Sequence, residues 1–184
     1  MVFAHDTRDA LRAAVALANS ALEPDTLDSL DALSDFFDDF DYTGRLDADR
    51  DELDQARAIR PELDALLTAG RDDAVRRINQ ILSRQNAVPQ LVRRGGLDWH
   101  IHAVADDAPL ATRILVETAM AMIDVVRSDE LDRLGRCADE ACSGIVLDLS
   151  RNRSRLYCST ACGNRNAVAA YRARLSREEQ DASS

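Results

Sequence analysis

Several things that this sequence lacks narrow what it can be. Aromatic residues make up only 4% of the 184 residues, so aliphatic side chains must fill most of the core. No apolar run approaches the length of about 18 residues that a membrane-spanning helix needs, and we expect no membrane contact. The first residues lack the basic-then-apolar pattern of a signal peptide, so the cytoplasm is the expected location.

Motifs that indicate catalysis are also missing. The chain has no G-x-x-x-x-G-K-[ST], no G-x-G-x-x-G after a predicted strand and no H-E-x-x-H. No serine or acidic residue lies in a recognisable nucleophile context. We therefore expect a protein that is not an enzyme.

Lysine is absent as well, and the charge that remains is unevenly distributed. The formal net charge is −10, which argues against a nucleic-acid partner for the chain as a whole. Residues 1–136 hold 27 acidic and 16 basic residues, whereas 149–177 contains seven arginines and no acidic residue. The sequence thus predicts an acidic body followed by a modestly basic C-terminal end.

Apolar residues at three- and four-residue steps predict a mainly helical N-terminal region. Asp6 is the expected N-cap of the first helix. Pro61 falls inside the third periodic segment, so that helix is either kinked or divided in two. The predicted helices span 7–22, 26–40, 47–69, 72–86, 108–127 and, as a short final turn, 129–134.

One segment changes period and predicts a β-hairpin over 88–104. It alternates with period two around Gly95-Gly96. Leu97, Trp99, Ile101 and Ala103 share one predicted face, and His100 and His102 share the other. The two histidines are either ordinary polar-face residues or ligands for a metal or small anion. With Trp99 they form the predicted small-molecule site.

All four cysteines fall within 26 residues near the C-terminus. Cys137-x4-Cys142 is followed, after fifteen residues, by Cys158-x3-Cys162. Two close cysteine pairs with a short spacer indicate one structural Zn²⁺ held by four thiolates. Two disulfides or four buried free thiols are the alternatives. We predict strands over 144–149 and 154–157, then a helix from about 159 to 177 with Cys162 in its first turn, an α+β arrangement like a treble clef.

The segment from Cys137 to Arg174, including Cys158-Ser-Thr-Ala-Cys162-Gly-Asn-Arg165, resembles the CGNR zinc-finger family. The region before it, with Ala16-Leu-Ala-Asn-Ser20 and Trp99-His100, is similar to the ABATE domain, a putative stress-induced transcription regulator. The resemblance implies zinc at the four cysteines and a bacterial DNA-binding role for the finger. Many members have Trp where this chain has Tyr157. We place the domains at 1–134 and 135–178, with a disordered tail over 179–184.

These observations favour a zinc-dependent DNA-binding regulator. With Val168 and Tyr171 facing the module's hairpin, arginines of the last helix would project outward toward phosphates or guanine edges. The predicted DNA contacts are Arg151, Arg153, Arg165, Arg172 and Arg174. One alternative is a zinc-stabilised interaction or assembly module, with a homodimer among its expected partners. The other is a small-molecule sensor that does not bind DNA directly.

Overall fold

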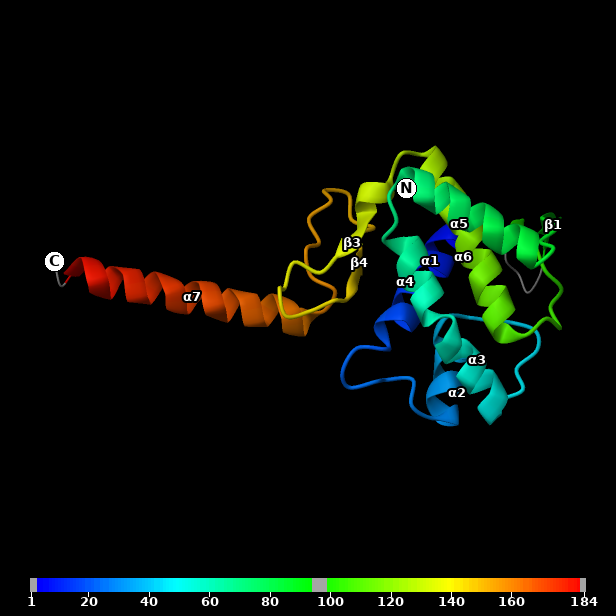
Figure 1. Cartoon of the computed structure of the whole chain (residues 1–184), viewed down its shortest axis with the longest axis horizontal. Helices are drawn as coiled ribbons and strands as arrows, with labels where there is room; N and C mark the ends of the chain where they lie inside the picture. The colour runs from blue at the N-terminus through cyan, green and yellow to red at the C-terminus, as the bar shows by residue number, and fades with distance from the viewer. Residues whose placement is uncertain (1–2, 94–98, 183–184) are drawn as a thin grey trace.

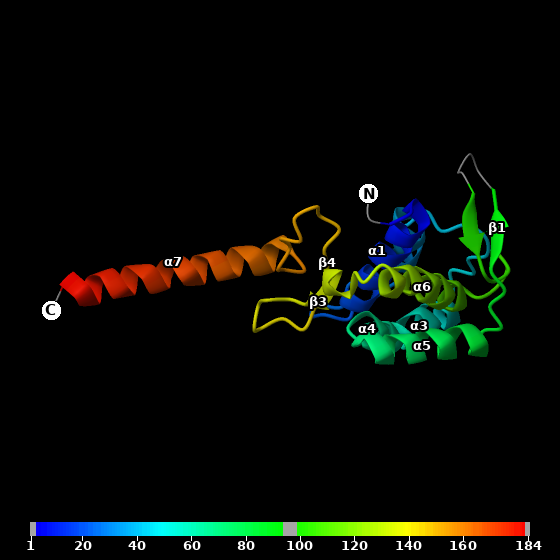
Figure 2. The ribbon, with the colours of Figure 1, turned by 90° about the horizontal axis from the view of Figure 1, so that it is seen from above.

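Helix α6 (Leu110–Arg127) lies at the centre of the helical body, as its nearly continuous apolar sequence predicts (Figure 2). It buries residues on most of its circumference, among them Ile114, Ala119 and Met122. Helices α1 (His5–Asn19) and α5 (Arg71–Arg84) pack along it. The computed structural model describes residues 3–93 and 99–182. Along these residues no helix is both long and apolar enough to cross a membrane.

Three further helices of the described chain complete the body. They are α2 (Leu30–Asp39), α3 (Arg50–Ala58) and α4 (Arg60–Leu67), and two of them, α3 and α4, contact α6. The predicted 47–69 helix is divided, because the helix stops at Ile59 and Pro61 lies in the first turn of α4. Helix α2 begins later than predicted, at a Ser29 N-cap whose Oγ accepts from the N–H of Ala32 at 3.2 Å. Asp6 lies inside α1, so its predicted N-cap role is wrong.

Arg113 is a buried cation that ties α6 to the loop before α3. Its guanidinium donates to the carbonyl oxygens of Ala108, Thr43 and Arg45, and it lies 5.8 Å from the centre of the Phe37 ring. Glu117 follows one turn later on α6. Burial raises the pKa of the Glu117 carboxyl to about 7, although the nearby Arg113 charge opposes that shift.

The predicted N-terminal hairpin is present as β1 (Gln90–Val92) and β2 (His100–His102). The strands are antiparallel, with Val92 opposite His100 and Gln90 opposite His102. The predicted Gly95-Gly96 turn lies outside the described residues. On the predicted apolar face Trp99 is 63% and Ile101 43% exposed, Ala103 is buried, and Leu97 lies outside the described residues. The hairpin extends from the edge of the helical bundle, which explains why Trp99 and Ile101 stay exposed (Figure 2).

The C-terminal module contains a second two-stranded sheet, formed by β3 (Leu134–Arg136) and β4 (Ile145–Leu147). A 3₁₀ turn, η1 (Leu131–Arg133), precedes β3 where a short helix was predicted. The predicted strand over 154–157 is wrong, because β4 pairs with β3 instead. Asp148 accounts for the difference: its carboxylate accepts from the N–H groups of Ser150 and Arg155 and folds this segment into a loop.

The module packs directly on the helical body. Ile145 and Leu147 of β4 are buried in the same core as α1. The Asn19 side chain, at the end of α1, donates to the Ile145 carbonyl at 2.8 Å and accepts from its N–H at 2.7 Å. Arg136 forms a two-pronged ion pair with Asp64 of α4, at 2.6 and 2.7 Å. These contacts join the two parts without a flexible linker.

Helix α7 (Thr160–Ala182) projects away from the rest of the chain (Figure 1). Val168 is 48% and Tyr171 55% exposed, so the prediction that they face the hairpin is wrong. The helix continues through Ala182, and residues 179–182 are therefore helical where a disordered tail was predicted. Ser183 and Ser184 lie outside the described residues.

The Asn19–Ile145 pairing should contribute measurably to stability. Replacing Asn19 by Ala leaves both backbone groups of the buried Ile145 without these partners, and we expect a loss of about 1–3 kcal/mol. Urea unfolding of the zinc-loaded chain measures this. The exposed Asn79→Ala on α5 is the control, with a change within about 0.5 kcal/mol. Equal stability of the two variants would contradict a structural role for the pairing.

Glu117 should make stability depend on pH. The folded chain holds this proton more tightly than the unfolded chain, so stability falls as pH rises from the ordinary value of 4.5 through about 7. Glu117→Gln removes the titrating carboxyl group. The fall in the free energy of unfolding with rising pH should therefore shrink by at most about 3 kcal/mol, and the variant should be more stable than wild type at pH 8. Thermal unfolding at pH 5 and pH 8 tests this, with exposed Asp28→Asn as control. An unchanged pH profile in Glu117→Gln would contradict it.

Candidate metal centre

The four cysteines meet at one point, although they come from two separate parts of the module. Cys137 follows β3, Cys142 precedes β4, and Cys158 and Cys162 lie at the start of α7. All four Sγ atoms lie within 4.8 Å of one another, with Cys142–Cys158 at 3.5 Å and Cys158–Cys162 at 3.8 Å. Tetrahedral Zn–S bonds of about 2.3 Å give sulfur–sulfur edges of about 3.8 Å. The donor set therefore fits a zinc ion.

Local backbone structure brings each sulfur to this point. Ser159 caps α7, because its Oγ accepts from the N–H of Cys162 at 3.2 Å, and Cys162 falls in the first helical turn as predicted. The module's hairpin encloses the first cysteine pair, whereas the sequence predicted a hairpin between the two pairs. The Ala138 N–H donates to the carbonyl of Leu156 at 2.9 Å, which joins the two cysteine-bearing segments.

Hydrogen-bond donors surround the sulfurs. The Gly144 N–H donates to Cys142 Sγ and the Cys158 N–H donates to Cys137 Sγ, both at 3.4 Å. The Arg165 guanidinium donates to Cys162 Sγ at 3.3 Å and to the buried Asp139 carboxylate at 2.7 Å. The hydrogen bond from Arg165 lowers the pKa of Asp139. Such outer contacts orient thiolate ligands and offset part of their charge.

The sulfurs affect one another's ionisation. Burial and the adjacent sulfurs of Cys142 and Cys137 raise the pKa of the Cys158 thiol. Burial also opposes ionisation of Cys137, but the N–H groups of Cys158 and Asp139 leave the Cys137 pKa lowered. Four thiolates at this separation repel one another strongly unless a cation lies between them. A divalent ion removes this conflict and leaves no open coordination position for substrate.

Disulfides do not account for the four cysteines. All four are free thiols, and each lies close to the other three and not in two separate pairs. Tyr157, at the position where many CGNR members have Trp, packs against the cluster with Val146. The aromatic exchange therefore leaves the cluster intact.

The predicted DNA-contact arginines fall into two groups. Arg165 is used inside the module, and Arg153 pairs with Glu130 at 2.6 Å and with Asp132. The other three are exposed, and within the described part of the chain they form no ion pair. These three are Arg151, in the loop after β4, and Arg172 and Arg174 on α7, where Arg174 lies 5.8 Å from the centre of the Tyr171 ring.

The predicted small-molecule site on the N-terminal hairpin is only partly assembled. His100 and His102 are half-buried and their rings lie 4.9 Å apart, while Trp99 points into solvent. His102 Nδ1 lies 3.5 Å from an Asp106 carboxylate oxygen. None of the three lines the pocket beside the metal centre or the shallow hollow on the surface of α5.

Sequence reasoning missed three residues that support the centre: Asp139, Gly144 and Asn19. Asp139 lies between the first two cysteines, and this position could have indicated that it supports the centre. The position of Gly144, two residues after Cys142, could have indicated the same. A Cβ built on Gly144 would lie 2.9 Å from Cys158 Sγ, 3.1 Å from Leu22 Cδ1 and 3.2 Å from Cys142 Sγ. Asn19 lies in the Ala16–Ser20 segment that resembles ABATE, but no local pattern indicated its partner Ile145, which is 126 positions away.

Four clustered thiols on a hairpin and a helix N-terminus define a zinc-finger module, joined here to a helical body. Comparison with known families finds a match for each part, the zinc-finger module and the helical body. Residues 133–175 match the CGNR zinc finger, and residues 4–129 match ABATE, described as a putative stress-induced transcription regulator. The ABATE match covers more than half of the chain, so the chain belongs to the ABATE family. No curated protein matches the sequence.

Gly144 provides a direct test of the centre. In Gly144→Ala the new methyl group meets two ligand sulfurs and Leu22, so we expect zinc affinity to fall about tenfold or more. Competition with a chromogenic zinc chelator measures it. Gly135→Ala in β3 is a matched control, because nothing lies within 4 Å of its added Cβ. Equal zinc retention by both variants would contradict the tight packing at Gly144.

Proposed function

We propose that this chain is a zinc-dependent DNA-binding regulator in which α7 contacts DNA. One structural Zn²⁺, held by Cys137, Cys142, Cys158 and Cys162, would fix the start of that helix. The ion's role is to bind the two cysteine-bearing segments together, since metal binding supplies folding free energy to small modules of this kind. This proposal implies that the protein lies in the cytoplasm and associates with the nucleoid.

The observation that carries the proposal is the exposed, projecting α7. Its Arg172 and Arg174 side chains are exposed and do not pair with acidic residues of the described chain. An α-helix fits the major groove of B-DNA, where arginine can reach phosphates and guanine edges. Arg151 is a further candidate contact. Arg153 and Arg165 are weaker candidates, because their ion pairs would have to break before they could reach DNA.

A second candidate function is assembly through the same helix. Val168, Tyr171 and Leu175 are 48%, 55% and 40% exposed, and they fall on one face of α7. A helix with such a stripe can pair with another helix, which would make the chain a homodimer. The two candidates differ in one observable, which is affinity for duplex DNA at low salt.

Anisotropy measurements with a labelled DNA duplex test the first candidate. We expect salt-dependent binding by the zinc-loaded chain, at least tenfold weaker in the double variant Arg172→Ala/Arg174→Ala. The slope of log affinity against log salt should fall by about 2, because two phosphate contacts are lost. The double variant Arg50→Ala/Arg76→Ala removes the same charge from the exposed surface of the body and should change little.

Two outcomes would count against DNA binding by α7. Unchanged affinity in the Arg172/Arg174 variant would remove this helix from the interface. No binding at low salt, together with a stable dimer in sedimentation, would favour the assembly function. Dimer loss in Val168→Glu would then assign that dimer to the apolar stripe.

A further inference from the structure

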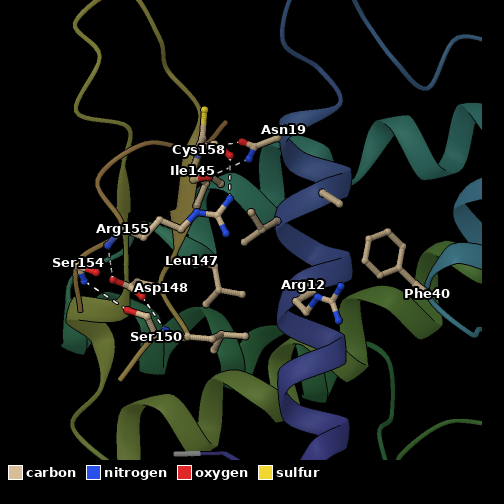
Figure 3. Close-up of a pocket in the computed structure, with 13 residues that line it drawn as sticks. Arg12, Asn19, Phe40, Ile145, Leu147, Asp148, Ser150, Ser154, Arg155 and Cys158 are labelled. Carbon is tan, nitrogen blue, oxygen red and sulfur yellow. Dashed lines mark hydrogen bonds between the residues drawn. The ribbon is translucent and has the colours of Figure 1, made fainter. Parts of the chain in front are cut away.

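A cavity lies where the helical body meets the zinc module. Its volume is about 480 Å³, within the range of about 300–1,000 Å³ typical of small-molecule sites. It is bounded by α1, the end of α2, β4 and the loop from Asp148 to Cys158 (Figure 3). Apolar side chains form much of its wall: Val15, Ala16, Phe40, Ile145, Leu147 and Leu149.

Two guanidinium groups border this apolar wall. Arg12 projects from α1 and forms a long ion pair with Asp9, with 3.8 Å between Nη1 and Oδ1. Arg155 extends from the loop toward α1 and donates to the carbonyl oxygens of Cys158 at 3.0 Å and Tyr157 at 3.3 Å (Figure 3). Within the described chain Arg155 forms no ion pair. Both cations therefore keep donor capacity for an added acceptor.

The carboxylate and the amide of the wall are already used. The Asp148 carboxylate accepts from the N–H groups of Ser150 and Arg155, at 2.8 and 2.7 Å, so its oxygens point into the loop's own backbone. The Asn19 amide is paired with Ile145 in both directions. What remains for a ligand is an apolar surface with positive charge at its border, together with the hydroxyl groups of Ser150 and Ser154.

We propose that this cavity binds an amphipathic organic anion, a carboxylate with an aliphatic body. The apolar wall would bury the aliphatic part, at about 25 cal/mol for each Å² removed from water. Arg12, from α1, and Arg155, from the loop, would attract the carboxylate to the border of the wall, because guanidinium groups form strong charge-assisted hydrogen bonds with carboxylates. A bare inorganic anion gains nothing from the apolar wall, and a neutral alcohol gains little from the arginines.

Such a ligand would touch both parts of the chain at once. Val15 and Ala16 belong to the helical body, whereas Leu147 and Cys158 belong to the zinc module. Cys158 is also one of the four clustered thiols, so the cavity and the metal centre share a side chain. A molecule bound there would stabilise the docked arrangement of body and module. This gives the regulator an effector site independent of the N-terminal hairpin.

Calorimetric titration of decanoate into the zinc-loaded full chain tests the proposal. We expect one site with a dissociation constant below about 1 mM. Decanol and inorganic phosphate should bind at least tenfold more weakly. Arg12→Gln should weaken decanoate binding about tenfold, and Ala16→Leu, which fills the cavity from α1, should abolish it. Arg50→Gln removes an exposed charge outside the cavity and is the matched control.

Several results would overturn the proposal: no decanoate binding, equal binding of decanol or phosphate, or equal affinity in Arg12→Gln and Arg50→Gln. Circular dichroism and zinc content first establish that each variant is folded. If Ala16→Leu is not folded, the comparison of the two arginine variants decides. DNA takes no part in these measurements, so their failure would leave the proposed function of α7 standing.

Discussion

Repulsion among four clustered thiolates is the constraint on which the C-terminal module depends. Their Sγ atoms lie within 4.8 Å of one another, and only a cation between them makes that arrangement favourable when they ionise. The same convergence joins the β3–β4 hairpin to the first turn of α7. The cysteine cluster therefore sets the direction in which α7 leaves the body. The exposed part of that helix contributes no residue to the cluster.

The metal centre is coupled to the helical body through one short stretch of β4. Gly144 packs against two ligand sulfurs and Leu22, and the next residue, Ile145, pairs with Asn19 at the end of α1. Adjacent residues thus contact the centre and the body. A displacement of the cysteine loop cannot leave the α1 contact unchanged, because interiors packed this closely transmit strain. The shared wall of the cavity at Cys158 is a consequence of the same proximity.

The sequence was informative where a local pattern has a single physical solution. Cysteine spacing predicted the cluster, and apolar periodicity predicted α6 almost to its ends. It failed where contacts outside the local pattern decide. The segment 154–157 was predicted as the partner strand of 144–149, but Asp148 holds it as a loop. Val168 and Tyr171 looked like core residues because spacing cannot reveal that α7 has no surface beside it. Asn19 gave no sign of its distant partner.

The exposed position of α7 makes the proposed DNA contacts compatible with a net charge of −10. The helix has 23 residues and spans about 35 Å at about 1.5 Å for each residue. Arg172 lies twelve residues after Thr160, hence about 18 Å along the axis. The Debye length at physiological salt is about 8 Å, so the acidic body's field is strongly screened at that distance. An anionic partner could approach Arg172 and Arg174 while remaining clear of the body. A helix packed on the hairpin, as the sequence suggested, would have kept these arginines within the repulsion of the acidic helices.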